Sequence, residues 1–287
     1  MPRILTGDAY ANTIFSGSSY TDLEQTYVYA GAGNDTVFGG SGFDNLYGEG
    51  GDDYLEDSSG AGKLFGGDGN DILVAGAGQC TLDGGAGNDV FAFMNTSTGY
   101  HAVVGGGDFD RILAYTNNTK IGLKSISDID LIDASGYSNV TIEANVTGAY
   151  LDFTNVVLNN IAAINGKDGA DTIIGSAGDD FIFGGWVGVD VLNGGAGNDT
   201  LGGDNGSSLT GGSGADLFVF TGGTVKVTDF NAAEGDRMGL ASGATWTATD
   251  VTGGARVAVT FSAGYTRSMT LMGITADQVD ASWFRAV

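Results

Sequence analysis

Large apolar residues recur at every ninth position in the first third of the chain. They are Val37, Leu46, Leu55, Leu64, Leu73, Leu82 and Phe91. Between them lie stretches that are rich in glycine and aspartate. Because successive side chains of a strand point to opposite faces, this pattern predicts short strands that each send one large side chain inward. A single strand of this kind cannot bury that side chain, so the units must stack to make a continuous core.

The polar stretches repeat as regularly as the apolar positions. Seven nine-residue units follow one another without a gap from Ala30 to Ala92, for example AGAGNDTVF and GGDGNDILV, and a weaker unit, GGGDFDRIL, begins at Gly105. A second array runs from Gly166 to Val219 and includes GKDGADTII and GGAGNDTLG. Glycine permits the positive φ of a tight turn and lets carbonyl groups approach a ligand closely. Aspartate supplies a hard carboxylate oxygen of the kind that Ca²⁺ prefers.

Glycine and aspartate are also ordinary turn residues on a solvated face. Turn chemistry alone, however, does not require aspartate at the sixth place of ten separate units. The repeat fits the pattern G-G-x-G-x-D-x-U-x, where U is a large apolar residue. The chain therefore resembles the RTX repeat proteins. That resemblance implies an all-β fold, a right-handed parallel β-roll or β-helix solenoid with two calcium-binding arrays and a β-rich C-terminal cap.

The resemblance also implies that two units make one turn of the roll, with calcium between stacked loops on the same side. Each unit then lies over the second unit after it, which sorts the aspartates of the first array into two rows. One row contains Asp35, Asp53, Asp71 and Asp89. The other carries Asp44, Gly62 and Cys80 at the same place. We expect the first row to bind about three ions and the second row, which keeps one carboxylate, to be weak or empty.

The second array sorts in the same way. One row contains Asp180, Asp199 and Asp216, and the other contains Asp171, Asp190 and then Ser208 in a shortened unit. With both arrays the expected total is about six Ca²⁺. The resemblance further implies backbone carbonyl ligands, for example those of Gly31, Gly33, Gly48 and Gly50.

The chain contains one cysteine and one histidine. Neither a disulfide framework nor a cysteine-rich zinc site can form within it. Cys80 occupies a ligand place in a degenerate unit, and we interpret it as a plain buried thiol and not as a redox or coordinating group. His101 lies in a polar stretch, where we expect a surface or linker position. Since no paired nucleophile and base is visible, we expect no enzymatic activity.

Acidic side chains outnumber basic ones by 35 to 11, which gives a formal charge of −24. This charge disfavours nucleic acid and anionic lipid as partners and favours cations. No stretch approaches the ~18 to 20 apolar residues that span a bilayer, so we expect no membrane insertion. Without calcium the stacked carboxylates would repel one another. We therefore expect extracellular calcium to drive folding.

Composition divides the chain into five predicted segments. They are an N-terminal cap (1–29), a first β-roll (30–113), a calcium-free β-helix segment or alternatively a globular insertion (114–165), a second β-roll (166–220) and a C-terminal cap with a secretion signal (221–287). The stretch from Met269 to Val287 resembles the uncleaved signal of type I secretion substrates, the alternative being an ordinary final strand. The first residues lack the apolar region of a cleaved signal peptide. We expect an extracellular or cell-surface protein that engages the type I secretion machinery.

Two functions stay open at this point. The first is a secreted structural protein of a surface layer, matrix or filament that self-associates through its ends or flanks. The second is a calcium-dependent adhesin or glycan-binding module that uses exposed aromatic residues on a cell-surface polysaccharide. Candidate aromatic residues are Tyr47, Tyr54, Trp186 and Trp246.

Overall fold

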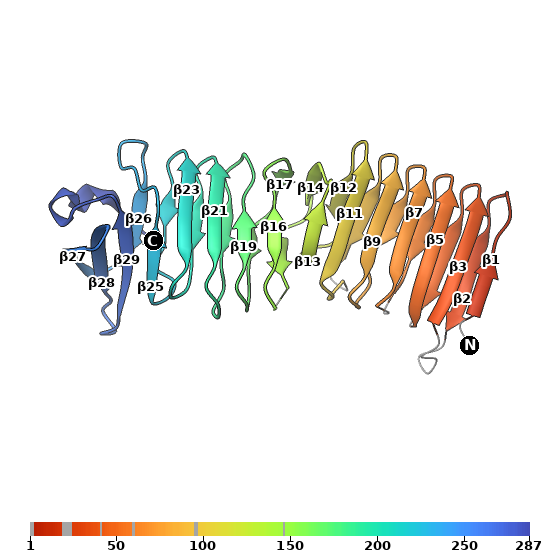
Figure 1. Cartoon of the computed structure of the whole chain (residues 1–287), viewed down its shortest axis with the longest axis horizontal. Helices are drawn as coiled ribbons and strands as arrows, with labels where there is room; N and C mark the ends of the chain where they lie inside the picture. Colours follow the sequence, from red (N-terminus) through yellow and green to blue (C-terminus); the bar gives the residue numbers. More distant parts are fainter. Residues whose placement is uncertain (1–2, 19–24, 41, 59–60, 95–96, 146) are drawn as a thin grey trace. The chain divides into compact units, whose positions relative to one another are not determined.

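The computed structural model describes residues 3–18, 25–40, 42–58, 61–94, 97–145 and 147–287. The chain forms two compact units, one made of Met1–Glu143 with Val156–Ala162 and the other of Ala144–Asn155 with Ala163–Val287. Within each unit, short strands stack in parallel as the rungs of a solenoid (Figure 1). The predicted all-β parallel solenoid is confirmed. No helix among the described residues is long and apolar enough to cross a membrane.

The first unit contains two parallel sheets. The first sheet consists of β1 (Arg3–Thr6), β3 (Gln25–Ala32), β5 (Phe43–Gly50), β7 (Lys63–Asp68), β9 (Thr81–Ala86), β11 (His101–Gly107), β13 (Lys120–Ser127) and β15 (Thr141–Ala144). The second consists of β2 (Thr13–Ser18), β4 (Thr36–Gly40), β6 (Tyr54–Glu56), β8 (Ile72–Val74), β10 (Val90–Phe93), β12 (Arg111–Ala114), β14 (Leu131–Asp133) and β17 (Val157–Asn159). Consecutive strands of the chain thus alternate between the sheets over most of the unit.

The nine-residue repeat sets the register of this unit. Leu46 pairs with Leu64, and Leu64 pairs with Leu82, so each strand lies over the strand eighteen residues later. In the other sheet Leu55 pairs with Leu73 in the same way. All of these side chains are fully buried. The stacking of each unit over the second unit after it is therefore as predicted, and every rung adds a leucine-sized group to one core, worth roughly 1.5 to 3 kcal/mol of burial.

The second unit repeats this arrangement. One of its sheets consists of β16 (Tyr150–Asp152), β19 (Thr172–Ile174), β21 (Val191–Ala196), β23 (Ser208–Ser213), β25 (Thr224–Val227), β29 (Thr266–Met272), β28 (Gly254–Thr260) and β27 (Thr245–Val251). The other consists of β18 (Ala163–Asn165), β20 (Phe181–Phe183), β22 (Thr200–Gly202), β24 (Leu217–Phe218), β26 (Arg237–Leu240) and β30 (Phe284–Ala286). Its core is a ladder of aliphatic side chains such as Ile173, Leu192 and Leu209, all fully buried.

The C-terminal part of the second unit departs from the parallel pattern. Strands β27, β28 and β29 pair with one another in antiparallel fashion, while β29 also pairs in parallel with β25. Two short 3-10 helices, η1 (Ala276–Gln278) and η2 (Ala281–Trp283), precede the last strand. Trp246 stacks on Phe284 with ring centroids 4.7 Å apart. These packed aromatic side chains cover the end of the core that the last parallel rung would otherwise expose.

Residues 120–165 supply further rungs within each unit. Strands β13 and β15 extend one sheet of the first unit, and β14 and β17 extend the other. In the second unit β16 and β18 occupy the corresponding positions. The boundaries of the five segments stay predictions, and residues 1–2 and 19–24 of the expected N-terminal cap lie outside the described residues.

Candidate metal centres

Each aspartate of the first predicted row reaches back to the rung before it. Oδ1 of Asp53 accepts a hydrogen bond from the backbone N–H of Asp35 at 2.7 Å. Oδ1 of Asp71 accepts one from Asp53 at 2.8 Å, and Oδ1 of Asp89 accepts one from Asp71 at 2.8 Å. The hydrogen bonds form a ladder along one side of the first unit. They hold all of these carboxylates in the same orientation.

The second oxygen of each carboxylate in this row is different. Oδ2 of every member is buried and has no hydrogen-bond partner in the protein. The side chains concerned are those of Asp35, Asp53, Asp71 and Asp89, each 2% exposed or less. A buried carboxylate oxygen without a partner carries a large desolvation penalty unless a cation or a donor compensates it. The row is therefore incomplete as protein alone.

Glycines bring these oxygens close to backbone carbonyl groups. A Cβ added to Gly48 would lie 2.2 Å from Oδ2 of Asp53 and 2.5 Å from the carbonyl oxygen of Gly66. A Cβ on Gly66 would meet Asp71 and the next carbonyl in the same way. Only glycine leaves room for a carboxylate and a carbonyl to converge here. Several hard oxygen donors in one loop gap are the donor set that Ca²⁺ requires, so the residues fit this ion.

Carboxylates alone do not complete such a site. Within the described ranges, no three or more His, Cys, Asp or Glu side chains are grouped closely enough to hold a metal ion. The resemblance implies that backbone carbonyls are the further ligands. Gly31 and Gly33 have φ values of 105° and 108°, and the N–H of Gly33 donates to the carbonyl of Gly50 at 2.7 Å. The specific carbonyl ligands, including those of Gly31, Gly33, Gly48 and Gly50, stay predictions.

The ladder extends beyond the residues that sequence reasoning selected. Oδ1 of Asp110 accepts from the N–H of Asp89 at 2.8 Å, and the N–H of Asp110 donates to Asp130 at 2.8 Å. Oδ2 of Asp110 is also buried without a partner. This residue stands at the sixth place of the weak unit GGGDFDRIL. The unit itself was recognisable, and its aspartate could have been included on that basis.

The second unit contains a ladder of the same construction. Oδ1 of Asp199 accepts from the N–H of Asp180 at 2.8 Å, and Oδ1 of Asp216 accepts from Asp199 at 2.9 Å. Oδ2 is buried and unpartnered in Asp199 and Asp216. In Asp180, by contrast, Oδ2 accepts from both the N–H and the hydroxyl of Ser176 at 2.7 and 2.9 Å. The open carboxylate oxygens therefore belong to the second and third aspartates of the row.

The opposite row of the second unit ends at a serine. Asp171 donates its N–H to Oδ1 of Asp190 at 3.1 Å, and the N–H of Asp190 donates to the hydroxyl oxygen of Ser207 at 3.0 Å. The serine at the ligand place is thus Ser207, and the assignment of Ser208 was wrong. The shortened unit shifts the register by one residue, and Ser208 begins β23 instead.

The opposite row of the first unit holds one aspartate that the sequence reasoning missed. Asp57, like Asp44, is fully buried. It stands at the first place of its unit, where most other units of the array have glycine, while the sixth place is Gly62. A Cβ on Gly62 would lie 2.7 Å from Oδ2 of Asp57, so this carboxylate fills room that the glycine leaves. The two residue types have exchanged places within one loop.

Cys80 and His101 lie next to each other on this side. Cys80 is buried as predicted, and burial raises the pKa of its thiol to about 12. The expected surface position of His101 was wrong, because this residue is fully buried as the first inward position of β11. Its Nδ1 accepts from the N–H of Cys80 at 3.3 Å, and its ring packs edge-on against Phe93. Burial lowers the pKa of His101 to about 4, so the ring is neutral.

Burial raises the pKa of the loop carboxylates towards neutrality. The pKa of Asp71 rises to about 7 and that of Asp53 to about 6, with repulsion from neighbouring aspartates adding to desolvation. In the second unit the pKa of Asp199 also rises to about 7. Values of about 6 apply to Asp110, Asp171 and Asp216. A cation between the loops removes this penalty, because it stabilises the ionised form.

Comparison with known proteins agrees with this geometry. The family model of the RTX calcium-binding nonapeptide repeat matches the chain in four copies, at residues 29–64, 56–91, 163–186 and 187–208. No curated protein matches the chain. A similar solved structure is the crystal structure of extracellular lipase LipA from Serratia marcescens, at 20% identity and a TM-score of 0.28. The match covers 95% of this chain and 42% of the lipase chain, so the chain spans less than half of that protein. The nonapeptide arrays carry the aspartate ladders, and the chain contains RTX calcium-binding nonapeptide repeats.

Proposed function

We propose that the chain is a secreted structural protein that folds on binding extracellular calcium and then assembles into a surface layer, matrix or filament. The observation that carries the proposal is the row of buried, unpartnered Oδ2 atoms, shown most regularly by Asp53, Asp71 and Asp89. These atoms lie in the interior of stacked loops. The stack is therefore unfavourable without a cation and favourable with one.

The chain's own residues hold the loops ready for the ion. The N–H-to-carboxylate hydrogen bonds fix Oδ1 of each aspartate, which leaves Oδ2 facing the loop gap. Glycines such as Gly48 and Gly66 keep the gap open to carbonyl groups. Bound calcium supplies positive charge that offsets the carboxylates. The binding free energy is in this way folding free energy.

The expected magnitude supports the coupling. Extracellular calcium modules bind at roughly 10⁻⁴ to 10⁻³ M. Free calcium at about ten times the Kd stabilises a site by about 1.4 kcal/mol. About six such sites contribute on the order of 8 kcal/mol, which is comparable to the roughly 5 to 15 kcal/mol of net stability of a whole domain.

Self-association is supported by flat aromatic strips on the first unit. Tyr29, Tyr47 and Phe65 stack on three neighbouring strands, with ring centroids 4.8 and 4.9 Å apart. On the other sheet Phe15 stacks on Phe38 at 5.0 Å and is 63% exposed. The other four rings are half-buried, and apolar patches that reach the surface commonly mark contact surfaces. A head-to-tail contact that uses them can propagate without closing.

The proposal includes export through the type I secretion machinery to the cell surface or beyond. It is supported by the RTX repeats, which are typical of secreted proteins, and by the final segment described above. The proposal assigns no catalysis to the chain. Its single histidine, His101, is fully buried and therefore has no access to a substrate.

Negative-stain microscopy and sedimentation velocity test the assembly. Purified protein in millimolar calcium is expected to form sheets or filaments, which EGTA disperses. A matched variant, Phe15→Ser with Phe38→Ser, removes one aromatic strip and should reduce assembly while leaving the calcium-induced circular dichroism unchanged. Protein that folds with calcium yet stays monomeric at all concentrations would contradict the structural function and leave calcium-coupled folding intact.

A further inference from the structure

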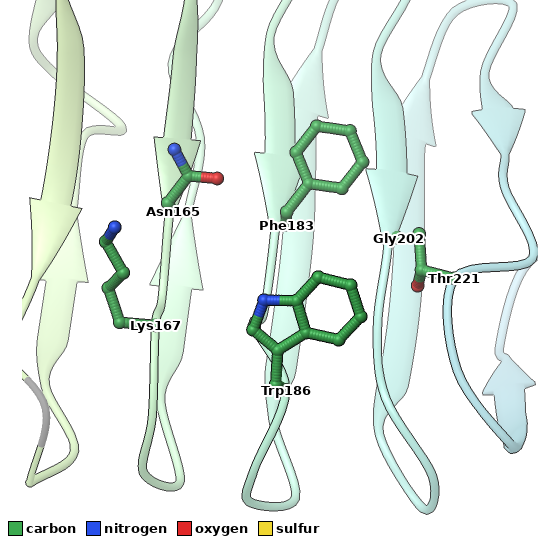
Figure 2. A pocket seen from close by; sticks show the side chains of 7 residues that line it. Asn165, Lys167, Phe183, Trp186, Gly202 and Thr221 are labelled. Carbon is green, nitrogen blue, oxygen red and sulfur yellow. The ribbon is translucent and has the colours of Figure 1, made fainter.

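We propose that a hollow on the outer face of the second unit binds a ring of a neutral polysaccharide. The hollow has a volume of about 240 Å³. It is lined by Asn165, Lys167, Phe183, Gly185, Trp186, Gly202 and Thr221 (Figure 2). This binding function goes beyond the structural function proposed above and uses residues that the calcium ladders do not.

Trp186 is an extra residue in its loop. The segment Gly184–Asp190 contains one residue more than the equivalent segment Gly166–Asp171 on the neighbouring rung. The backbone N–H of Trp186 donates to the carbonyl of Lys167 at 3.1 Å, and pairing with that rung then resumes after the insertion. The indole is 77% exposed. Packing between the rungs therefore does not depend on the side chain of Trp186, although tryptophan has the largest side chain of the amino acids.

Gly202 lets the ring of Phe183 pack closely against the backbone at the floor of the hollow. Phe183 pairs with Gly202 on the next rung. A Cβ on Gly202 would lie 2.9 Å from the ring of Phe183 and 2.7 Å from the methyl group of Thr221. The backbone of Gly202 is not in the left-handed region, so its conformation does not require glycine. Glycine at this position instead leaves room for the ring of Phe183 and the methyl group of Thr221 to pack against the backbone of β22.

Polar groups stand on the rungs to either side of the two aromatic rings. Asn165 pairs with Phe183 at the same outward position, and Thr221 lies beyond Gly202 (Figure 2). Lys167 keeps a side chain although its φ is 70°, at a place where the neighbouring rung has Gly185 with φ 111°. A side chain in the left-handed region is strained. The chain nevertheless keeps the Lys167 side chain at the edge of this hollow.

A pyranose ring fits this chemistry better than other occupants. Its apolar C–H face can stack on an indole, while its hydroxyl edge can bond to amide and hydroxyl groups, and sites of this mixed kind orient ligands with few polar contacts. The formal charge of −24 disfavours acidic polymers at this hollow. The small volume suits one ring and not an extended peptide.

Affinity electrophoresis in calcium tests the proposal. The wild-type chain is run in native gels that contain dextran, mannan or soluble β-glucan, with alginate as an acidic comparison. We expect retardation by at least one neutral polymer, weakened about tenfold or more in Trp186→Ala, because an exposed indole at the centre of a contact carries much of the affinity. Gly202→Val, which must displace the ring of Phe183 and the methyl group of Thr221, should also weaken it. Tyr150→Ala removes a 59% exposed aromatic residue of the same unit outside the hollow and should change nothing.

Three outcomes would overturn the proposal: no retardation by any neutral polymer, equal retardation of Trp186→Ala and the wild type, or retardation by alginate alone. Circular dichroism of the same samples reports calcium-coupled folding separately. Because the Trp186 side chain is mostly exposed, Trp186→Ala is expected to show the wild-type calcium response. If Trp186→Ala loses sugar binding but keeps the calcium-induced change in circular dichroism, the hollow is the sugar-binding site. If the wild type shows no calcium-induced change, the result counts against the proposed calcium function.

Discussion

The backbone N–H of Asp53 donates to Oδ1 of Asp71 on the following rung at 2.8 Å, while Oδ2 of Asp71 is buried without a partner. One oxygen of the carboxylate thus serves the fold, and the other is left for a ligand. The same division recurs at Asp89 and, in the second unit, at Asp199 and Asp216. It separates two roles that substitutions can test independently.

Replacement of Asp71 should distinguish these roles. Asp71→Asn keeps an oxygen that can accept from the N–H of Asp53 but removes the charge, so we expect weaker calcium binding with the calcium-bound fold preserved. Asp71→Ala removes both the accepting oxygen and the charge. It leaves the buried backbone N–H of Asp53 without an acceptor, at a cost of about 1 to 3 kcal/mol of stability. Isothermal titration calorimetry gives the calcium stoichiometry and affinity, and thermal unfolding gives the stability.

Two controls make the Asp71 result specific. Asp52 is exposed, lies outside the row and accepts from the N–H of Asn70 at 2.8 Å. Asp52→Asn should therefore leave the calcium stoichiometry unchanged. Asp44→Ala, in the row expected to be weak or empty, should remove less bound calcium than Asp71→Ala. Equal losses from Asp44→Ala and Asp71→Ala would contradict the one-sided row in the first array.

Removal of calcium should unfold the arrays. Because six or so sites together contribute about as much free energy as a domain's net stability, we expect EGTA at neutral pH to abolish most of the strand signal in far-ultraviolet circular dichroism. Added calcium should restore it. Magnesium at equal concentration is the control, since it demands a tighter octahedral geometry and dehydrates reluctantly. A spectrum that chelation does not change would refute the coupling.

The metal-free fold should be more stable in acid than at neutral pH. Burial raises the pKa of Asp53, Asp71 and Asp199 from 3.8 to about 6 or 7. The folded state therefore binds protons more tightly than the unfolded state. This contribution is fully present below about pH 4 and is lost as the pH rises through 6 to 7.

Thermal unfolding of calcium-depleted protein, followed by circular dichroism from pH 4 upwards, checks this pH dependence. The midpoint should fall as the pH rises until the strand signal is lost near neutral pH, whereas with saturating calcium it should fall much less or rise. The calcium affinity itself should decrease on acidification, because protons compete for Asp53 and its neighbours. A midpoint of the metal-free protein that climbs between pH 5 and 7.5 would show that the carboxylates are not desolvated as described.

A methyl group at Gly66 should disrupt a site, whereas one at Gly50 should not. A Cβ on Gly66 would lie 2.2 Å from Oδ2 of Asp71 and 2.4 Å from the carbonyl of Gly84. Gly66→Ala is therefore expected to lower calcium affinity and to destabilise the first unit. A Cβ on Gly50 would meet nothing within 4 Å, and its φ is not positive. Gly50→Ala should stay within about 1 kcal/mol of the wild type, by chemical denaturation in calcium.

The repeat made most of the fold predictable, because the eighteen-residue offset fixes which residues stack. The pairing of Leu46 with Leu64 and the ladder from Asp35 to Asp89 both follow from that offset. The metal role of these aspartates and the exact carbonyl ligands stay predictions. The sequence pattern was sufficient where each rung has the regular length.

Irregular units account for what the sequence did not reveal. The burial of His101 follows from its inward position at the start of β11, which a polar local composition concealed. Asp57 escaped notice because its carboxylate reaches the gap from the first place of a loop and not the sixth. The insertion at Trp186 was visible as one extra residue. The side chain of Trp186 lines a hollow together with Phe183. This placement depends on the packing between rungs, which periodicity alone does not specify.

The hydrogen bonds between aspartates give each row a direction. In the second unit the backbone N–H of each aspartate in the row donates to the carboxylate of the next aspartate along the chain. Each rung therefore depends on the following rung for this hydrogen bond. In the second unit this succession ends at Asp236, whose Oδ2 accepts from Asn231 of its own turn at 2.8 Å. The C-terminal end of the row is therefore completed within its own turn, whereas the carboxylate ladder of each earlier rung depends on the rung that follows it.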